Sequence, residues 1–320
     1  MNTEFHDIAA RTPSDVWVVG GTGRTLIEHW NGSSWSVVPS QNVGNGENTL
    51  RSVTALAADN AWAVGYYYSD TVEGGIGTLI EHWNGTQWDI VASPNVTGSS
   101  YLQAVDAVSP TDIWAVGYYQ SGNEGGVLTM HWNGVEWSVV PAPALPGTAR
   151  LNGVSAIAAD DVWAVGSYGA AWSPLALHWD GTAWTQVQVS DDGETILEDV
   201  TATGPDDVWA VGHYDGLPYF PRIYHWNGTQ WSSITSPIRG SGALLFGVSA
   251  VAEDAAWAVG YYIDDTNRPF ALRWDGTQWT VVATNSGVES SQFLMSVSAS
   301  SVNDVWAAGF FHGGIQASTG

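Results

Sequence analysis

One short motif recurs along the chain and constrains its fold more than any other feature. It consists of a tryptophan, a four-residue segment that begins with Asn-Gly or Asp-Gly, and a second tryptophan. The six copies are residues 30–35, 83–88, 132–137, 179–184, 226–231 and 274–279. Asn-Gly between strand-forming residues is the strongest short-range hairpin signal, and it predicts a type I′ turn with positive φ at both central residues. Each copy is therefore expected to be a β-hairpin whose two tryptophans pair across the strands.

Two further motifs precede each hairpin. The pattern Asp-x-Trp-Ala-Val-Gly, as in residues 112–117, recurs with its tryptophans 45 to 52 residues apart. Before it comes Leu-x-x-Val-x-Ala, as in residues 102–107, in which apolar residues alternate with the period of a strand. Each unit is thus predicted to contain four strands: strand A (Leu-x-x-Val-x-Ala), strand B (Trp-Ala-Val-Gly), strand C before the hairpin turn and strand D after it.

Four-stranded units that repeat at this spacing are typical of a β-propeller. A parallel β-helix would have a shorter repeat, and a β-sandwich would not repeat so faithfully. We therefore predict that residues 1–320 form a single all-β propeller domain with seven blade positions of four-stranded antiparallel units. The units begin near Phe5, Leu50, Leu102, Leu151, Leu197, Leu245 and Phe293.

The seventh unit is expected to be incomplete. It has a strand A at residues 293–299 and a strand B at residues 305–311, and residues 314–319 resemble the start of a strand C. No Trp-Asn-Gly hairpin follows. Either the ring closes with a partial blade or the sequence is a fragment of a longer chain, and we favour the fragment.

Together these motifs resemble Trp-rich bacterial β-propeller repeats. The chain is similar to propellers of the photosystem II assembly-factor type and, more distantly, to Asp-box and kelch propellers. The likeness covers nearly the whole chain and implies a fold more than a function. The Asp-box pattern is Ser-x-Asp-x-Gly-x-x-Trp, and residues 132–137 are one residue tighter. This departure argues against transferring sialidase or other Asp-box enzyme activity.

Composition limits the partners. The net charge is −24, with no lysine and eight arginines, so nucleic acid is a poor ligand. There is no cysteine, and no apolar run is long enough for a membrane-spanning helix. The first residues show no signal peptide, and we expect an extracellular or cell-surface location for a segment cut from a longer secreted protein.

Histidine and aspartate recur at fixed positions. A histidine precedes the first hairpin tryptophan in five units, and Arg273 replaces it in the sixth. Equivalent positions in neighbouring blades are too far apart to share an ion, so a hydrogen bond within the blade is favoured over a metal or catalytic role. The aspartate two residues before the strand B tryptophan is expected to cap its turn through a backbone N–H. Asp191 and Asp192 with Glu194 form the only weak calcium candidate, and no metal or cofactor is predicted.

No catalytic motif is present. The nucleophile elbow Gly-x-Ser-x-Gly, the metalloprotease His-Glu-x-x-His and the phosphate-binding Gly-x-x-x-x-Gly-Lys are all missing, and the arginines are scattered over the repeat. Three hypotheses follow: a non-enzymatic binding module for carbohydrate or protein, which we favour; a protein-interaction scaffold or assembly factor; and a glycoside hydrolase or lyase.

The variable loops indicate where a ligand would bind. An up-and-down blade places the A–B and C–D turns at one end and the B–C and D–A loops at the other. The second end carries the variation in length and chemistry, and binding residues concentrate in such loops. Tyrosine and tryptophan there suit both sugars and protein surfaces. The predicted ligand-binding residues are Tyr66, Tyr67, Tyr118, Tyr119, Tyr168, Trp172, Tyr214, Tyr261, Tyr262 and Phe310.

Overall fold

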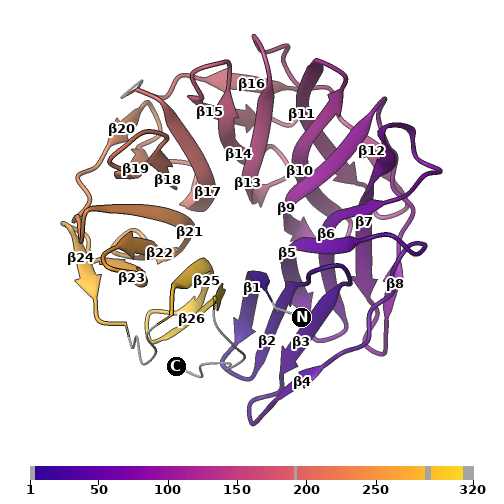
Figure 1. Cartoon of the computed structure of the whole chain (residues 1–320), viewed down its shortest axis with the longest axis horizontal. Coiled ribbons are helices and arrows are strands. Elements are labelled where there is room, and N and C mark those ends of the chain that lie inside the picture. The colour runs from indigo at the N-terminus through magenta and orange to yellow at the C-terminus, as the bar shows by residue number, and fades with distance from the viewer. Residues whose placement is uncertain (1–3, 191–192, 285–289, 313–320) are drawn as a thin grey trace.

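The computed structural model describes residues 4–190, 193–284 and 290–312, and it is a β-propeller. Radial antiparallel sheets surround a central channel, and the first strand of each sheet lies innermost (Figure 1). Every sheet follows chain order from the channel outward. The first three sheets are β1 (Phe5–Thr12), β2 (Asp15–Gly20), β3 (Leu26–Trp30) and β4 (Trp35–Val37); β5 (Asn48–Ala57), β6 (Asn60–Tyr68), β7 (Ile76–Trp83) and β8 (Trp88–Ile90); and β9 (Ser99–Ser109), β10 (Asp112–Ser121), β11 (Glu124–Trp132) and β12 (Trp137–Val139).

The remaining sheets repeat this arrangement. They are β13 (Ala149–Ala158), β14 (Asp161–Tyr168), β15 (Ser173–Trp179) and β16 (Trp184–Val187); β17 (Thr195–Gly204), β18 (Asp207–Tyr214), β19 (Pro221–Trp226) and β20 (Trp231–Ser233); β21 (Gly242–Ala252), β22 (Ala255–Ile263), β23 (Asn267–Trp274) and β24 (Trp279–Val282); and β25 (Gln292–Ser301) with β26 (Asp304–Phe311). A short 3₁₀ helix, η1 (Glu73–Gly75), precedes β7. No helix in the described part of the chain is long and apolar enough to cross a membrane.

The blade count differs from the prediction. The six four-stranded blades are confirmed, but the structure has six blades and a two-stranded sheet, not seven blades. The strand C pattern expected at residues 314–319 lies outside the described residues. The β25–β26 sheet sits between the sixth blade and the first and closes the ring there, with Ser298 Oγ accepting a hydrogen bond from Ala10 N–H at 2.9 Å.

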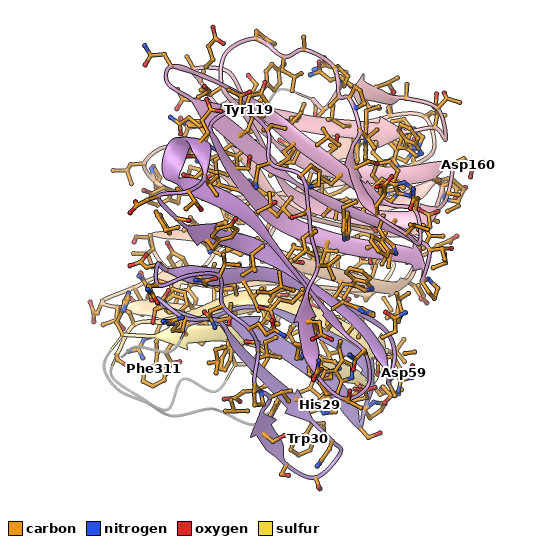
Figure 2. The ribbon with its side chains drawn as sticks, turned by 90° about the vertical axis from the view of Figure 1, so that its right-hand side faces the viewer. His29, Trp30, Asp59, Tyr119, Asp160 and Phe311 are labelled. Carbon is orange, nitrogen blue, oxygen red and sulfur yellow. The ribbon has the colours of Figure 1, made fainter. Side chains whose placement is uncertain are left out.

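The two ends of the ring are distinct, as the sequence predicted. Figure 2 shows Asp59 and Asp160, from two A–B turns, at one end, and Tyr119 and Phe311, from the ends of second strands, at the other. We call these the turn face and the loop face. The B–C and D–A loops lie at the loop face.

Tryptophans pack one sheet onto the next. The paired hairpin tryptophans lie directly opposite each other, as predicted; Trp83 and Trp88, for example, have ring centroids 6.0 Å apart. Both rings also contact Trp17 of the first blade, at 5.1 and 5.2 Å. The same triad, one strand B tryptophan against the hairpin pair of the next blade, recurs around the ring. The others are Trp62 with Trp132 and Trp137, Trp114 with Trp179 and Trp184, Trp163 with Trp226 and Trp231, Trp209 with Trp274 and Trp279, and Trp306 with Trp30 and Trp35.

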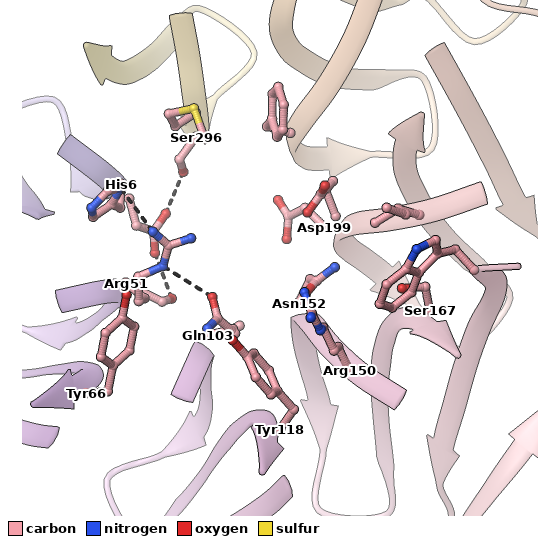
Figure 3. Close-up of a pocket in the computed structure, with 18 residues that line it drawn as sticks. His6, Arg51, Tyr66, Gln103, Tyr118, Arg150, Asn152, Ser167, Asp199 and Ser296 are labelled. Carbon is pink, nitrogen blue, oxygen red and sulfur yellow. Dashed lines mark hydrogen bonds between the residues drawn. The ribbon is translucent and has the colours of Figure 1, made fainter. Parts of the chain in front are cut away.

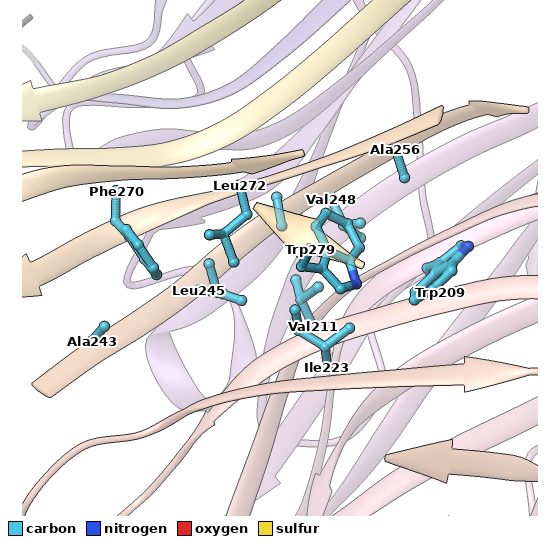
Figure 4. Packing of buried hydrophobic residues seen from close by; sticks show 11 residues of the cluster. Trp209, Val211, Ile223, Ala243, Leu245, Val248, Ala256, Phe270, Leu272 and Trp279 are labelled. Atoms are coloured by element: carbon cyan, nitrogen blue, oxygen red, sulfur yellow. The ribbon is translucent and has the colours of Figure 1, made fainter. Parts of the chain in front are cut away.

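Apolar residues from two neighbouring sheets fill the space around each triad. In one cluster Trp209, Val211 and Ile223 of the fifth blade meet Leu245 and Trp279 of the sixth, all nearly inaccessible to solvent (Figure 4). The core is therefore a series of layers between blades, each of which buries two sheet faces.

Half-buried aspartates join neighbouring inner strands. Each carboxylate accepts a backbone N–H from the next blade, and burial raises its pKa. The pKa reaches about 6 for Asp106 and about 8 for Asp199. The bonds run from Val53 to Asp7 at 2.8 Å, from Ala156 to Asp106 at 2.8 Å, and from Val248 to Asp199 at 2.9 Å.

The repeated histidines are structural, as predicted. In His131 the Nε2 atom lies 2.8 Å from Asp112 Oδ1, and the ring packs against that of Trp114, tilted by 35° with the centroids 4.5 Å apart. The aspartate therefore bonds a side chain of strand C, where the sequence predicted a bond to a nearby backbone N–H. In the sixth blade Ala255 occupies the aspartate position and Arg273 the histidine position, so the two partners are lost together. The other three Asp–His pairs are Asp15–His29, Asp161–His178 and Asp207–His225.

The hairpin turns are not type I′. Gly85 has φ of 90°, but Asn84 does not have positive φ; Trp172 is the one non-glycine residue with positive φ in the described ranges. Asn84 Oδ1 instead accepts the N–H groups of Thr86 and Gln87 at 3.0 and 3.1 Å. This side-chain bridge stabilises a four-residue loop, and it explains why only Asn or Asp occurs at this position.

The turn geometry leads to a stability prediction. The same bridge forms in the fifth blade, where replacing Asn227 with Ala removes the acceptor for the N–H groups of Thr229 and Gln230, so we expect it to lower the free energy of unfolding by about 1 kcal/mol. Asn227→Asp is the matched control, because Asp180 and Asp275 make the same bonds in the fourth and sixth blades. Chemical denaturation of both variants measures the difference. An equal loss in both would show that the bridge contributes nothing.

Candidate functional site

A β-bulge in every inner strand shapes the wall of the channel. In β5, Leu50 pairs with Gly65 and Ser52 with Val64, which leaves Arg51 without a partner in the ladder. Such a bulge redirects the side chain of its extra residue. The same irregularity recurs in all seven inner strands, at His6, Arg51, Gln103, Asn152, Glu198, Phe246 and Met295.

These seven residues all line one cavity of about 370 Å³ in the channel (Figure 3). Its wall also includes Tyr66 and Tyr118 near the ends of second strands and Trp172 in a B–C loop, so it opens toward the loop face. A second hollow of about 410 Å³ adjoins it and shares His6, Arg51 and Tyr66. Both volumes fall within the range of ligand sites in proteins.

Arg51 is held in the cavity by neutral partners. Its Nε donates a hydrogen bond to Gln103 Oε1 at 3.2 Å, and Nη1 lies 3.4 Å from His6 Nδ1 (Figure 3). Burial, with the adjacent Arg51 charge, lowers the pKa of His6 to about 3, so His6 is neutral and its Nδ1 can accept. Within the described residues Arg51 forms no ion pair with a carboxylate.

Arg150 lies between two aromatic rings at the mouth of the cavity. Its guanidinium carbon is 5.0 Å from the ring centroids of both Tyr118 and Trp172, a double cation–π arrangement. Tyr118 is also the first of a row of three rings. Tyr101 stacks on Tyr118 with the centroids 4.6 Å apart, and it contacts Tyr66 at 5.1 Å. Trp172 has φ of 49°, a conformation that costs free energy in a non-glycine residue and holds its ring in the B–C loop beside Arg150.

The acidic groups of the cavity are only partly ionised near neutral pH. Burial raises the pKa of Glu198 to about 7, opposed by Arg51 and Arg150, and raises that of Asp199 to about 8. Burial also lowers the pKa of His213, beside Glu198, to about 4. The two guanidinium groups therefore dominate the charge of the cavity, although the chain as a whole has a net charge of −24.

A second aromatic row lies on the other side of the channel. Phe246 stacks on Tyr261 at 5.7 Å, Tyr261 contacts Phe293 at 4.9 Å, and Phe293 stacks on Phe310 at 4.8 Å. His213 joins this row against Phe246 at 5.8 Å. The site therefore combines two guanidinium groups with aromatic rings on two sides of the channel and polar side chains between them, an arrangement suited to binding.

Strand alternation divides the predicted ligand-binding residues. Tyr66, Tyr118 and Trp172 line the cavity, and Tyr261 and Phe310 belong to the second aromatic row. Successive side chains of a strand point to opposite faces, so their neighbours lie elsewhere. Tyr67, Tyr168 and Tyr262 pack against the apolar clusters between blades, Tyr119 covers Gly126, and Tyr214 lies beneath Arg222.

The bulge residues were missed by sequence reasoning. They are the first variable position of the Leu-x-x-Val motif, where His6, Arg51, Gln103 and Glu198 replace one another after a leucine or phenylalanine. This chemical variation beside a nearly constant apolar residue was the available signal.

The structure bears on only part of what the sequence suggested about metal binding. The described residues contain no cluster of histidine and carboxylate groups that could hold a metal ion. Asp191 and Asp192, two of the three carboxylates of the calcium candidate, lie outside the described residues.

Comparison with known proteins identifies structural similarity only. No protein-family model and no curated protein matches the sequence. A structure of YCF48 bound to D1 peptide matches with a TM-score of 0.63 and 15% identity over 97% of this chain and 89% of that chain. The WD40 β-propeller domain of Doa1 matches with a TM-score of 0.62 and 11% identity over 96% of this chain and 90% of that chain. YCF48 from Cyanidioschyzon merolae matches with a TM-score of 0.60 and 15% identity over 97% of this chain and 93% of that chain.

What these proteins share with the chain is the fold. The resemblance to photosystem II assembly-factor propellers is thereby confirmed as a similarity of architecture. At such low identity the comparison assigns no ligand or partner.

Proposed function

We propose that the chain is a non-enzymatic protein-binding module, and that its channel cavity holds a polypeptide segment bearing a carboxylate. The observation that carries this proposal is the presence of Arg51 and Arg150 in the cavity, where neither forms an ion pair with a carboxylate of the described residues. Guanidinium groups bind carboxylates through charge-assisted and often bidentate hydrogen bonds. A chain with net charge −24 that keeps two such groups in one cavity favours an anionic ligand there.

The aromatic walls support a peptide over a sugar. A sugar ring stacks on a free aromatic face, but Tyr118 is covered by Tyr101 on one side and by Arg150 on the other. The aromatic rings of Tyr118 and Trp172 beside Arg150 suit the side chains that flank an acidic residue or a C-terminus in a peptide. The YCF48 structure with a D1 peptide supplies a precedent for peptide binding on this fold. A scaffold or assembly role would follow from such binding.

A peptide array tests the proposal. The array displays random peptides with free C-terminal carboxylates beside the same peptides with C-terminal amides, and a glycan array is probed in parallel. We expect peptide ligands that carry a carboxylate, and at least a tenfold loss of affinity in Arg150→Ala, equivalent to about 1.4 kcal/mol. Arg239→Ala is the matched control, because Arg239 lies outside the cavity lining. Its guanidinium carbon is 5.8 Å from the ring centroid of Tyr262.

Two results would contradict the proposal. One is glycan binding without peptide binding. The other is peptide binding that is equally strong in wild type, Arg51→Ala and Arg150→Ala, since the arginines would then take no part. Added salt provides a further check, because a charge-dependent contact weakens as ionic strength rises.

A further inference from the structure

The fourth blade differs from the others in one cross-strand pair on the wall of the cavity. The residue after the glycine of the strand B motif carries a ring in five units, but it is Ser167 in the fourth unit and Gly21 in the first. Ser167 pairs with Arg150, whereas the partner of each ring is an uncharged residue. The five pairs with a ring are Thr49–Tyr66, Tyr101–Tyr118, Ile196–His213, Leu244–Tyr261 and Phe293–Phe310. The fourth blade therefore places a charge and a small hydroxyl group where these pairs place a ring.

The hydroxyl group of Ser167 is positioned to bond a ligand. Ser167 is only 1% exposed, yet it lines the cavity beside Arg150 (Figure 3). Its Oγ atom has no hydrogen-bond partner among the described residues. A polar group withdrawn from water normally has a partner, because an unpaired one destabilises the fold. An oxygen atom of a ligand in the cavity would supply this partner.

Two aromatic rings fix the orientation of the Arg150 guanidinium group. Its carbon lies 5.0 Å from the ring centroids of both Tyr118 and Trp172, so the two faces of the planar group are covered. The backbone holds Trp172 in place, since its φ is 49° and its carbonyl oxygen accepts the N–H of Thr195 at 2.8 Å. No described residue accepts a hydrogen bond from Arg150. The edge of the guanidinium group, which carries its N–H groups, therefore remains for a ligand.

An edge bounded by two rings suits a planar anion. A carboxylate can lie in the plane of the guanidinium group and accept two parallel hydrogen bonds from it. A phosphate group is tetrahedral, so when two of its oxygens bond to the edge the others project out of the plane, toward the electron-rich faces of the rings. Phosphate also carries a charge of about −1.5 to −2 at pH 7, which Glu198 in the same cavity repels more strongly than a single charge.

Resting on the proposed function, we propose that Arg150, Ser167 and Trp172 form the carboxylate subsite of the cavity, which selects an acidic side chain of the bound peptide over a phosphorylated one. Arg150 donates two hydrogen bonds to the carboxylate through its edge, and Ser167 Oγ donates a third. Trp172 is a positioning residue, because it acts on the ligand through Arg150. Arg51 has no cation–π contact among the described residues, and it supplies charge without this selectivity.

Three peptide libraries test the subsite. Each has the form acetyl-x-x-Z-x-x-amide, in which x is any residue except aspartate and glutamate, and Z is aspartate, phosphoserine or asparagine. The capped ends remove the terminal carboxylate, so Z is the one acidic group of each peptide. We expect the full 320-residue protein at pH 7 to bind members of the aspartate library, and to bind the matched phosphoserine and asparagine peptides at least tenfold more weakly.

Variants of the protein locate the selectivity. Arg150→Lys keeps the charge and loses the planar edge, so we expect its affinities for matched aspartate and phosphoserine peptides to come within about threefold of each other. Ser167→Tyr introduces the residue that three other blades have at this position, so the propeller should still fold, and we expect at least a tenfold loss of affinity for the aspartate peptides. Trp172→Ala should reduce the preference for aspartate, and Trp172→Phe, which keeps a ring, should restore most of it. Arg239→Ala is the control, since Arg239 lies outside the cavity lining.

Three results would overturn the inference and leave the proposed function standing. The first is an affinity of the wild type for phosphoserine peptides that equals or exceeds its affinity for the matched aspartate peptides. The second is an unchanged preference for aspartate in Arg150→Lys, Ser167→Tyr and Trp172→Ala when their melting temperatures show that all three are folded. The third is a wild type that binds peptides with a free C-terminal carboxylate but none of the capped libraries. If neither kind of peptide bound, the proposed function would fail together with the subsite.

Discussion

Replacing Gly260 with Ala is expected to lower the free energy of unfolding by about 3 kcal/mol, the upper end of the usual cost of overpacking. Gly260 ends the Trp-Ala-Val-Gly motif in the sixth blade and pairs with Leu245 beside the bulge of β21. A Cβ atom at this position would lie 1.9 Å from the carbonyl oxygen of Leu244 and 2.9 Å from the Cα of Leu245. Both atoms belong to the backbone, so no side-chain rotation relieves the clash, and the inner strand would have to move.

Gly204→Ala is the matched control for this prediction. Gly204 also lies in a strand, has no positive φ, and its nearest neighbour to an added Cβ is 3.7 Å away, an ordinary contact. We expect it to change stability by less than about 0.5 kcal/mol. Thermal unfolding of both variants gives the comparison. Equal melting temperatures would mean that the inner strand yields without cost and that the bulge is not rigid.

Replacing Glu81 with Met is expected to stabilise the protein by about 2 kcal/mol at pH 7, and by more at higher pH. Glu81 is fully buried, and its Oε1 atom has no hydrogen-bond partner. Burial raises its pKa to about 8. The equivalent position, opposite the residue after the strand B tryptophan, is Met130 in the third blade and Leu177 in the fourth, both buried.

The pH dependence of the wild type follows from the same groups. Glu81, Glu198 and Asp199 have folded pKa values of about 8, 7 and 8, above the values of about 4 in the unfolded chain, so the folded state binds more protons and stability is lost as pH rises from about 4 to 8. Below about pH 6.5 the unfolded histidines take up protons that His6 and His213, with pKa values of about 3 and 4, do not, and this opposes part of the loss. Stability should therefore fall most steeply between about pH 6.5 and 8.

Melting temperatures of wild type and Glu81→Met between pH 6 and 9 test both expectations. The variant should lose less stability than wild type over this range. Glu28→Met changes the same position of the first blade, where the side chain is only partly buried, and should have a smaller effect. Identical pH profiles for wild type and Glu81→Met would show that Glu81 is ionised in the folded state.

The architecture was accessible from sequence because it rests on repetition. Each unit shows the alternation of its strands, the fixed turn between paired tryptophans and the same strand order. Because these signals recur in several units, a weak signal in one unit is supported by the same signal in the others. The turn type was predicted wrongly because the Asn-Gly signal concerns backbone φ values. In this chain Asn84 acts through its side chain, which accepts two N–H groups.

The candidate site was only partly accessible. Tyr66, Tyr118 and Trp172 were predicted because aromatic residues at strand ends are conspicuous, but Arg51 and Arg150 looked like scattered charges. Their convergence depends on closing the ring, which brings residues about a hundred positions apart to one cavity. The incomplete last unit was predicted, and its place beside the first blade needed the structure.

The bulges of the inner strands allow the residues that line the channel to change without disturbing the sheets. Because each bulged residue stands outside the ladder of backbone pairs, its identity is decoupled from the hydrogen bonds that hold the sheet together. Side chains as different as Arg51, Glu198 and Phe246 already share this position without altering the pairing on either side. Gene duplication of such a unit yields a ring in which seven sites can diverge independently, so one scaffold can acquire new ligands by changing seven codons.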